Sequence, residues 1–202
     1  MPANKEVEIK FLVEDLRSLR RKLRDNGFRE VTARTHEINT LYDTAGRSLR
    51  TRDELLRIRK YGNRWIFTHK GKGTSVRHKS RTETETEVAN GGKLAGIVQA
   101  LGFKPWFRYE KFRSEWTDGK GHVVLDETPI GIVSEIEGPP RWIDATAKRL
   151  GVARQQYVTL NYVQMFFDWK RQTGSKAQEM TFRAVGTRRR LLRQQLTDVA
   201  CD

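Results

Sequence analysis

The sequence predicts an α+β fold, in which antiparallel strands form a barrel with a polar interior and helices cover its outside. Two observations predict it. Several segments alternate between charged residues and apolar or β-branched residues, which is the period of a β-strand. Between them lie segments with apolar residues at helical spacing, each followed by a glycine that stops the helix.

The first half of the chain begins with a strand and a helix. Residues 5–12 place Glu6, Glu8 and Lys10 on one face and apolar residues on the other, so we expect a strand. Residues 13–26 carry leucines at helical spacing before a glycine, which predicts a helix. A long strand is expected next, over 28–43. A glycine–asparagine turn then joins the alternating segments 55–60 and 64–70, which predicts a hairpin.

The second half repeats this order. Residues 81–88 alternate strictly, with Arg81, Glu83 and Glu85 on one face and threonines on the other, which predicts a strand. A helix is expected over 93–101. Further strands are expected at 106–116, 122–127 and 132–137, followed by a helix at 143–150.

Two similar halves are therefore a hypothesis of the sequence, each supplying a strand with a charged face, a helix and returning strands. We expect one domain over residues 1–169. Residues 170–202 are polar and basic, with the run Arg188–Arg190, and predict a flexible extension. An amphipathic arm over 189–196, for a partner or an anionic surface, is the alternative.

The net charge of +14 over 202 residues indicates an anionic partner: nucleic acid, a membrane surface or a small anionic ligand. No apolar run reaches the ~20 residues that span a bilayer, and we expect no signal peptide. The single cysteine, Cys201, excludes an intrachain disulfide and favours a reducing, cytoplasmic setting. The four histidines lack the spacing of zinc ligands.

The charged faces of five predicted strands favour the small ligand. Solvated surface strands would also alternate, and this is the alternative interpretation. If the charged faces converge, however, they line a barrel interior, where charge must be hydrated, paired or bound to a ligand. Lysine and arginine would donate to phosphate oxygens, and glutamates would hold Mg²⁺ or Mn²⁺ bridging to those phosphates. Nucleic-acid binding would favour basic stripes without paired glutamates, so we consider it the weaker interpretation.

A set of short motifs resembles the CYTH superfamily, the triphosphate tunnel metalloenzymes. Glu6-Val7-Glu8-Ile9-Lys10 is similar to the N-terminal signature of that family. Its companions follow in family order over about residues 5–165: Leu41-Tyr42-Asp43-Thr44, Leu56-Arg57-Ile58-Arg59, His69-Lys70-Gly71, Arg81-x-Glu83-x-Glu85, Lys111-x-Arg113, Leu125-Asp126 and Glu135-Ile136-Glu137-Gly138.

The resemblance implies a closed eight-stranded antiparallel barrel that forms a triphosphate tunnel, often in a homodimer. It also assigns roles to residues of this chain. The metal ligands that it implies are Glu6, Glu8, Asp126, Glu135 and Glu137. The triphosphate-binding residues that it implies are Lys10, Arg57, Arg59, Lys70, Arg81, Lys111 and Arg113, of which Lys10, Lys70 and Arg113 would also be catalytic. Glu83 and Glu85 match less securely.

The family includes enzymes of two reaction types. Class IV adenylyl cyclases convert ATP to cyclic AMP and pyrophosphate, and triphosphatases hydrolyse inorganic triphosphate or thiamine triphosphate. Many relatives have a lysine where this chain has Leu160, and that lysine is implicated in handling the attacking water of triphosphatases. The sequence therefore favours the cyclase-like branch, with a triphosphatase as the alternative and a non-catalytic polyphosphate or nucleotide sensor as the second alternative.

Overall fold

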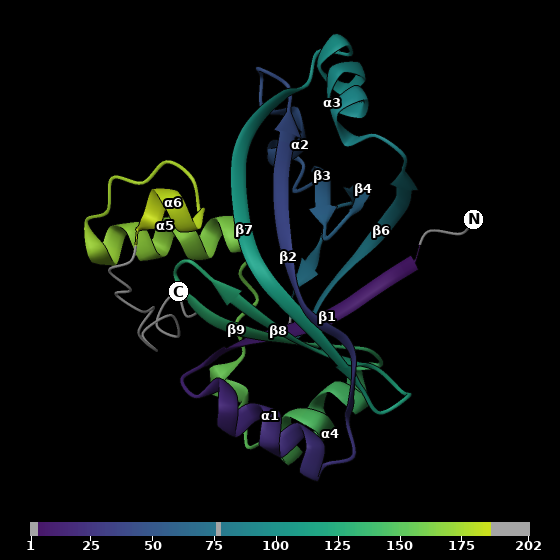
Figure 1. Ribbon diagram of the computed structural model, residues 1–202, viewed down its shortest axis with the longest axis vertical. Helices are drawn as coiled ribbons and strands as arrows, with labels where there is room; N and C mark the ends of the chain where they lie inside the picture. The colour runs from purple at the N-terminus through teal and green to yellow at the C-terminus, as the bar shows by residue number, and fades with distance from the viewer. Residues whose placement is uncertain (1–3, 76–77, 187–202) are drawn as a thin grey trace.

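A computed structural model of the protein describes residues 4–75 and 78–186 (Figure 1). Within these residues, nine strands form one antiparallel sheet in the order β1-β9-β8-β7-β2-β3-β4-β6-β5. An additional pairing of β1 with β6 closes the first eight strands of that order into a barrel. The strands are β1 (Asn4–Val13), β2 (Arg29–Asp43), β3 (Leu55–Tyr61), β4 (Arg64–Lys70), β5 (Thr74–Ser75), β6 (Lys79–Val88), β7 (Lys104–Thr117), β8 (His122–Thr128) and β9 (Gly131–Glu137). The predicted eight-stranded antiparallel barrel is confirmed.

The strand pairings are symmetric between the two halves of the chain. Each half contributes a meander, β2-β3-β4 in the first and β7-β8-β9 in the second. The meanders join through β2 and β7, and β1 and β6 pair with each other. β1 also pairs with β9, and β6 pairs with β4, so each half closes the meander of the other. This interlocking agrees with the repeat inferred from the sequence.

Helices lie outside the barrel, as expected. They are α1 (Leu16–Asp25), α2 (Ser48–Thr51), α3 (Gly91–Ala100), α4 (Pro140–Leu150), the 3₁₀ turn η1 (Arg154–Gln156), α5 (Tyr162–Thr173) and α6 (Phe182–Val185). α1 and α4 lie together at one end of the barrel, and α5 and α6 cover one side (Figure 1). α1 begins three residues later than expected because the Asp15 carboxylate accepts hydrogen bonds from the backbone N of Arg17 and Ser18, which caps the helix there.

Two apolar clusters attach these helices. Leu19 and Leu23 of α1 and Ile143 of α4 pack against outward-facing residues of the barrel such as Ile9 and Ile136. On the other side, Phe166 and Trp169 of α5 pack against Phe107 of β7. Phe107 lies on the same face of β7 as Lys111 and Arg113, so α5 covers one part of the inner face. The outward-facing apolar residues pack against α1 and α4, and this leaves the charged residues for the interior.

The chain does not leave the barrel at residue 170, which differs from the expected extension. α5 continues to Thr173, and Met180 is fully buried in the same cluster as Trp169. The backbone N of Met180 donates to the oxygen of Arg108, and the backbone N of Glu110 donates to the oxygen of Met180. Residues 170–186 are therefore part of the packed structure, because this short apolar contact and its backbone pairing outweigh their polar composition. The run Arg188–Arg190 and the proposed arm over 189–196 lie outside the described residues.

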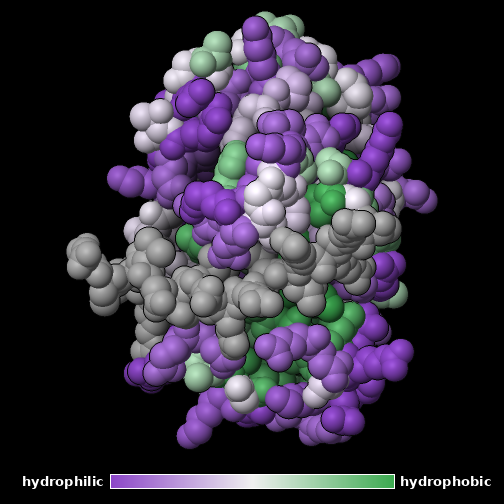
Figure 2. Space-filling view, turned by 90° about the vertical axis from the view of Figure 1, so that its left-hand side faces the viewer, coloured by the Kyte–Doolittle hydropathy of each residue, from purple (hydrophilic) through white to green (hydrophobic). Residues whose placement is uncertain are grey.

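Hydrophilic residues make up most of the face on which α5 and α6 lie, and an apolar area shows in its lower half (Figure 2). No helix in the described part of the chain combines the length and the apolar character needed to cross a bilayer.

Candidate functional site

A cavity of about 660 Å³ occupies the barrel and extends to α2 and the start of α5. Every predicted site residue lines it except Asp126. Those lining residues are Glu6, Glu8, Lys10, Arg57, Arg59, Lys70, Arg81, Glu83, Glu85, Lys111, Arg113, Glu135 and Glu137. The charged faces of the strands therefore converge on one space, and the alternative of solvated outward faces does not apply to them.

Strand register explains the convergence. Residues directly opposite each other in an antiparallel pair point to the same side of the sheet. Glu8 lies opposite Glu137, and Lys10 lies opposite Glu135. A slip of one residue in this pairing would turn these charges to the outside of the barrel.

Cations and carboxylates of the cavity form ion pairs with one another. The Lys70 Nζ atom lies 2.7 Å from the Glu6 carboxylate and 3.1 Å from that of Glu83. Arg59 pairs with Glu85 at 2.9 Å. The Lys10 Nζ atom contacts Glu8 and lies 3.2 Å from Glu135. A polyanion entering the cavity would replace the carboxylates around these cations.

Asp126 lies behind the cavity wall. Its side chain is fully buried and accepts hydrogen bonds from Lys111 Nζ at 2.8 Å, from Arg113 Nη2 at 2.6 Å and from the Tyr162 hydroxyl at 2.5 Å. The carboxylate holds the two cations of β7, a contact that sequence reasoning missed because it could not tell which inward residue lies deepest. The metal-binding role expected for Asp126 stays a prediction.

Glu37 of β2 is a second fully buried carboxylate, and sequence reasoning missed it. It lies 3.5 Å from Lys111 Nζ, 3.6 Å from Arg59 Nη1 and 4.0 Å from Arg113 Nε. Burial acts to raise the pKa of Glu37, but these cations outweigh it and hold the pKa well below its usual range. A signal was present, because Glu37 is a charged residue inside the predicted strand 28–43.

Lys79 of β6 is a further cavity residue that the sequence did not single out. It lines the cavity opposite Glu8 but makes no ion pair with any residue of the described chain. Burial lowers the pKa of Lys79 to about 8, and the neighbouring cations Lys10 and Arg81 add to this effect. An unpaired ammonium among other cations is costly unless an anion joins it.

The sequence pattern of the CYTH domain matches residues 4–137. The chain belongs to the CYTH family. A curated relative, a protein of Methanocaldococcus jannaschii named as a candidate adenylate cyclase, is 28% identical over 133 residues, which are 65% of this chain and 75% of the relative.

Solved structures of other proteins share the CYTH fold. A candidate adenylate cyclase from Vibrio parahaemolyticus superposes with a TM-score of 0.73 at 17% identity, covering 82% of this chain and 99% of that one. A Pyrococcus horikoshii protein gives 0.69 at 24% identity, covering 81% and 98%. A Hippeastrum protein, described as a candidate adenylyl cyclase with a dominant triphosphatase activity, gives 0.58 at 19% identity, covering 81% and 95%. At these identities the likeness establishes the fold alone.

The carboxylates of this CYTH cavity fit a divalent cation in their chemistry. Burial raises the pKa of Glu137 to about 7, and the nearby carboxylates of Glu6, Glu135 and Glu8 add to the rise. Glu137 makes no ion pair within the described residues, and the charge of Arg113 only partly offsets the rise in its pKa. In the described chain, however, no three His, Cys, Asp or Glu side chains stand arranged as a metal site. Metal binding would require the other glutamates to exchange their lysine and arginine partners for the ion.

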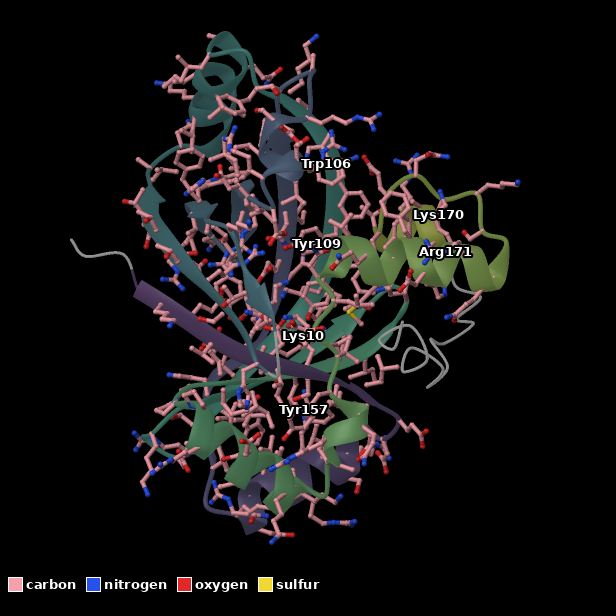
Figure 3. All side chains as sticks on the ribbon, turned by 180° about the vertical axis from the view of Figure 1, so that it is seen from behind. Lys10, Trp106, Tyr109, Tyr157, Lys170 and Arg171 are labelled. Atoms are coloured by element: carbon pink, nitrogen blue, oxygen red, sulfur yellow. The ribbon has the colours of Figure 1, made fainter. Side chains whose placement is uncertain are left out.

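The CYTH cavity also has an aromatic and apolar part. Trp106, Tyr109 and Lys10 follow one another along the inside of the barrel (Figure 3). Tyr109 accepts a hydrogen bond from Arg57 Nη1 at 3.4 Å, so it lies where the charged part begins. Beyond it, Leu41, Leu55 and other apolar residues line the cavity around Trp106. The cavity thus passes from a highly charged part to an aromatic and apolar one.

Proposed function

We propose that the protein is a divalent-metal-dependent enzyme that converts ATP to cyclic AMP and pyrophosphate, as class IV adenylyl cyclases do. The observation that carries the proposal is the convergence on one cavity of seven predicted triphosphate-binding cations and four of the predicted metal-binding glutamates. A binding module would need the cations alone, whereas the glutamates indicate metal-assisted chemistry.

In the proposed reaction the ribose 3′-oxygen attacks the α-phosphorus of ATP. A bond forms between these atoms, the bond from the α-phosphorus to the bridging oxygen of pyrophosphate breaks, and the hydroxyl proton passes to water. Lys10, Lys111 and Arg113 would donate hydrogen bonds to phosphate oxygens and disperse the charge that develops on the leaving pyrophosphate. Asp126 and Glu37 keep Lys111 and Arg113 in place for this work.

Glu6, Glu8, Glu135 and Glu137 are the residues that would hold Mg²⁺ or Mn²⁺. The bound ion would supply positive charge that lets carboxylates and phosphates share the cavity. Because Glu137 has no cationic partner in the described structure, it is the residue most available to a metal.

Hydrolysis of a triphosphate is the second candidate, and it is favoured by the activity described for the Hippeastrum protein with the same fold. Leu160 counts against it. This residue packs against the apolar cluster under α5 and places no cation beside an attacking water.

Product analysis tests the proposal. Purified protein is incubated with ATP, inorganic triphosphate or thiamine triphosphate, each with Mg²⁺ or Mn²⁺, and the products are resolved by chromatography. Cyclic AMP with equimolar pyrophosphate is the expected result. Orthophosphate as the sole product would establish the triphosphatase instead, and tight binding without turnover would establish a sensor.

A pair of matched variants tests the metal ligands. Glu137→Gln keeps the shape of the side chain and removes its charge, so turnover should fall by about 10- to 100-fold or more. Glu127→Gln is the control, because Glu127 pairs with Arg34 on the outer surface at 2.8 Å. Equal turnover of both variants at limiting metal would contradict the role of Glu137.

A further inference from the structure

Trp106 is turned towards the cavity by a β-bulge. In the pairing of β2 with β7, Leu41 lies opposite Phe107 and Tyr42 lies opposite Pro105, so Trp106 is the extra residue. A bulge redirects a side chain that a regular strand would point elsewhere. The indole consequently lines the cavity at its aromatic and apolar part.

Neighbouring residues hold this indole in place. The guanidinium carbon of Arg50 lies 3.9 Å from the centroid of the Trp106 ring. Arg50 Nε donates to Asp43 Oδ2 at 2.8 Å. Asp43 is itself buried and accepts from the backbone N of Thr44 and of Leu49, which ties it to α2. The ring is therefore fixed before a ligand arrives, and it needs little ordering on binding.

Free hydrogen-bond donors line the same part of the cavity at the start of α5. Asn161 Oδ1 accepts from the backbone N of Gln164, and Gln164 Oε1 accepts from the backbone N of Asn161, both at 2.9 Å. This capping box occupies the amide oxygens and fixes both side chains. In the described structure, the amide NH₂ groups of both residues have no hydrogen-bond acceptor. They are thus available to acceptor atoms of a ligand in the cavity.

We propose that this part of the cavity binds the base of a nucleoside triphosphate. The base stacks on Trp106, and its acceptor atoms receive hydrogen bonds from Asn161 and Gln164. The inference rests on the proposed function, because triphosphate held near Lys10 leaves the nucleoside to extend past Tyr109 to Trp106 (Figure 3). Inorganic triphosphate has no base, so it would not contact Trp106, Asn161 or Gln164.

Binding of two probes separates the two parts of the cavity. Affinities for ATP and for inorganic triphosphate are measured by calorimetry with Mn²⁺, within minutes of mixing. Trp106→Ala should weaken ATP binding about ten-fold or more, since stacking on an aromatic side chain contributes that much per base, and should leave triphosphate binding unchanged. Trp106→Phe keeps a ring and should recover most of the loss.

A second variant protects the test against misfolding. Asn161→Ser keeps a good helix cap and removes the amide donor, so ATP binding should weaken about two- to ten-fold without loss of the helix. Phe167→Ala is the control on the same helix, because Phe167 is exposed and does not line the cavity. It should change neither affinity.

The outcomes distinguish this inference from the proposed function. If the wild-type protein binds neither probe, both fail. If it binds ATP and triphosphate equally and neither Trp106→Ala nor Asn161→Ser affects ATP, the base-binding site is refuted while the triphosphate site stands. If Trp106→Ala and Trp106→Phe each weaken the binding of ATP and of inorganic triphosphate to the same extent, Trp106 supports the phosphate site. That result would also overturn the inference.

Discussion

Several charged residues of this barrel are buried and need partners that compensate their charge. Lys111 is 2% exposed, and Asp126 and Glu37 are fully buried, so each depends on its partners for compensation. Lys111 and Arg113 line the cavity, whereas the carboxylates of Asp126 and Glu37 contact these cations without lining the cavity. This arrangement keeps the cations oriented even when no anion is bound.

Replacing Asp126 by Asn should lower the free energy of unfolding by about 3–5 kcal/mol, because Lys111 and Arg113 lose their shared partner while remaining buried. Chemical denaturation measures the change. Asp168→Asn is the control, since its partner Arg171 is mostly exposed and such a pair contributes at most about 1 kcal/mol. An Asp126→Asn protein that is as stable as wild type but has lost metal affinity would favour the metal-binding role predicted for Asp126.

Lys79 has the opposite character, because this cation has no ion-pair partner among the described residues. Its pKa is lowered from 10.5 to about 8, so between these values the unfolded chain binds more protons and stability rises with pH. Below pH 8 the burial of the charged ammonium therefore destabilises the fold. Lys79→Met should raise the melting temperature at pH 7 and should lose this advantage progressively as the pH rises from 8 to 10.5.

The same variant should bind triphosphate about ten-fold more weakly, because a charge-assisted contact is lost. Lys104→Met, at an exposed position outside the cavity, should change neither property. If Lys79→Met binds triphosphate as tightly as wild type, Lys79 does not contact the ligand.

At the scale of elements, α5 and the segment up to α6 act as a brace along the part of β7 that β8 does not reach. Met180 contributes a fully buried side chain, and its backbone pairs with that of β7 at Arg108 and Glu110. The start of the same helix carries Asn161 and Gln164 to the cavity. The brace therefore couples packing along β7 to the shape of the aromatic and apolar part of the site.

Met180→Ala should consequently lower the free energy of unfolding by about 2–5 kcal/mol. Met180→Leu conserves volume and should cost less than about 1.5 kcal/mol. Both are measured by denaturant titration. A negligible effect of Met180→Ala would mean that residues 170–186 do not support the barrel.

For the whole molecule, the question is which of its positive charges attract the ligand. The net charge of +14 acts over long range and is screened within about 10 Å at moderate salt. Arg59, by contrast, lines the cavity on a regular strand and is buried against Glu37 and Glu85. Contacts inside the cavity are screened much less than those at the surface.

Arg59→Ala should therefore weaken triphosphate binding about ten-fold or more at both low and high salt. Replacing Arg188–Arg190 by alanine should cause a small loss that disappears at high salt. Titrations of both variants at two salt concentrations make the comparison. If the triple replacement weakens triphosphate binding more than Arg59→Ala does, the result would favour nucleic acid or an anionic surface as the partner.

The sequence by itself determined the side of the barrel on which each charge lies. Strand residues alternate with a period of two, so the phase of Glu6-x-Glu8-x-Lys10 or Arg57-x-Arg59 fixes which residues share a face. The repeated order of strand, helix and returning strands also indicated two similar halves. These properties are local, and no distant contact was needed to infer them.

Only the tertiary structure decided how deep each charge lies and which partner it has. Asp126 and Lys79 both follow the inward alternation, yet one is buried behind three donors and the other has no carboxylate partner in the described chain. The bulge that turns Trp106 inward and the contact that retains residues 170–186 likewise depend on strands far apart in the sequence. Periodicity along one strand specifies direction, whereas depth, pairing and desolvation depend on the strands and helices that close around it.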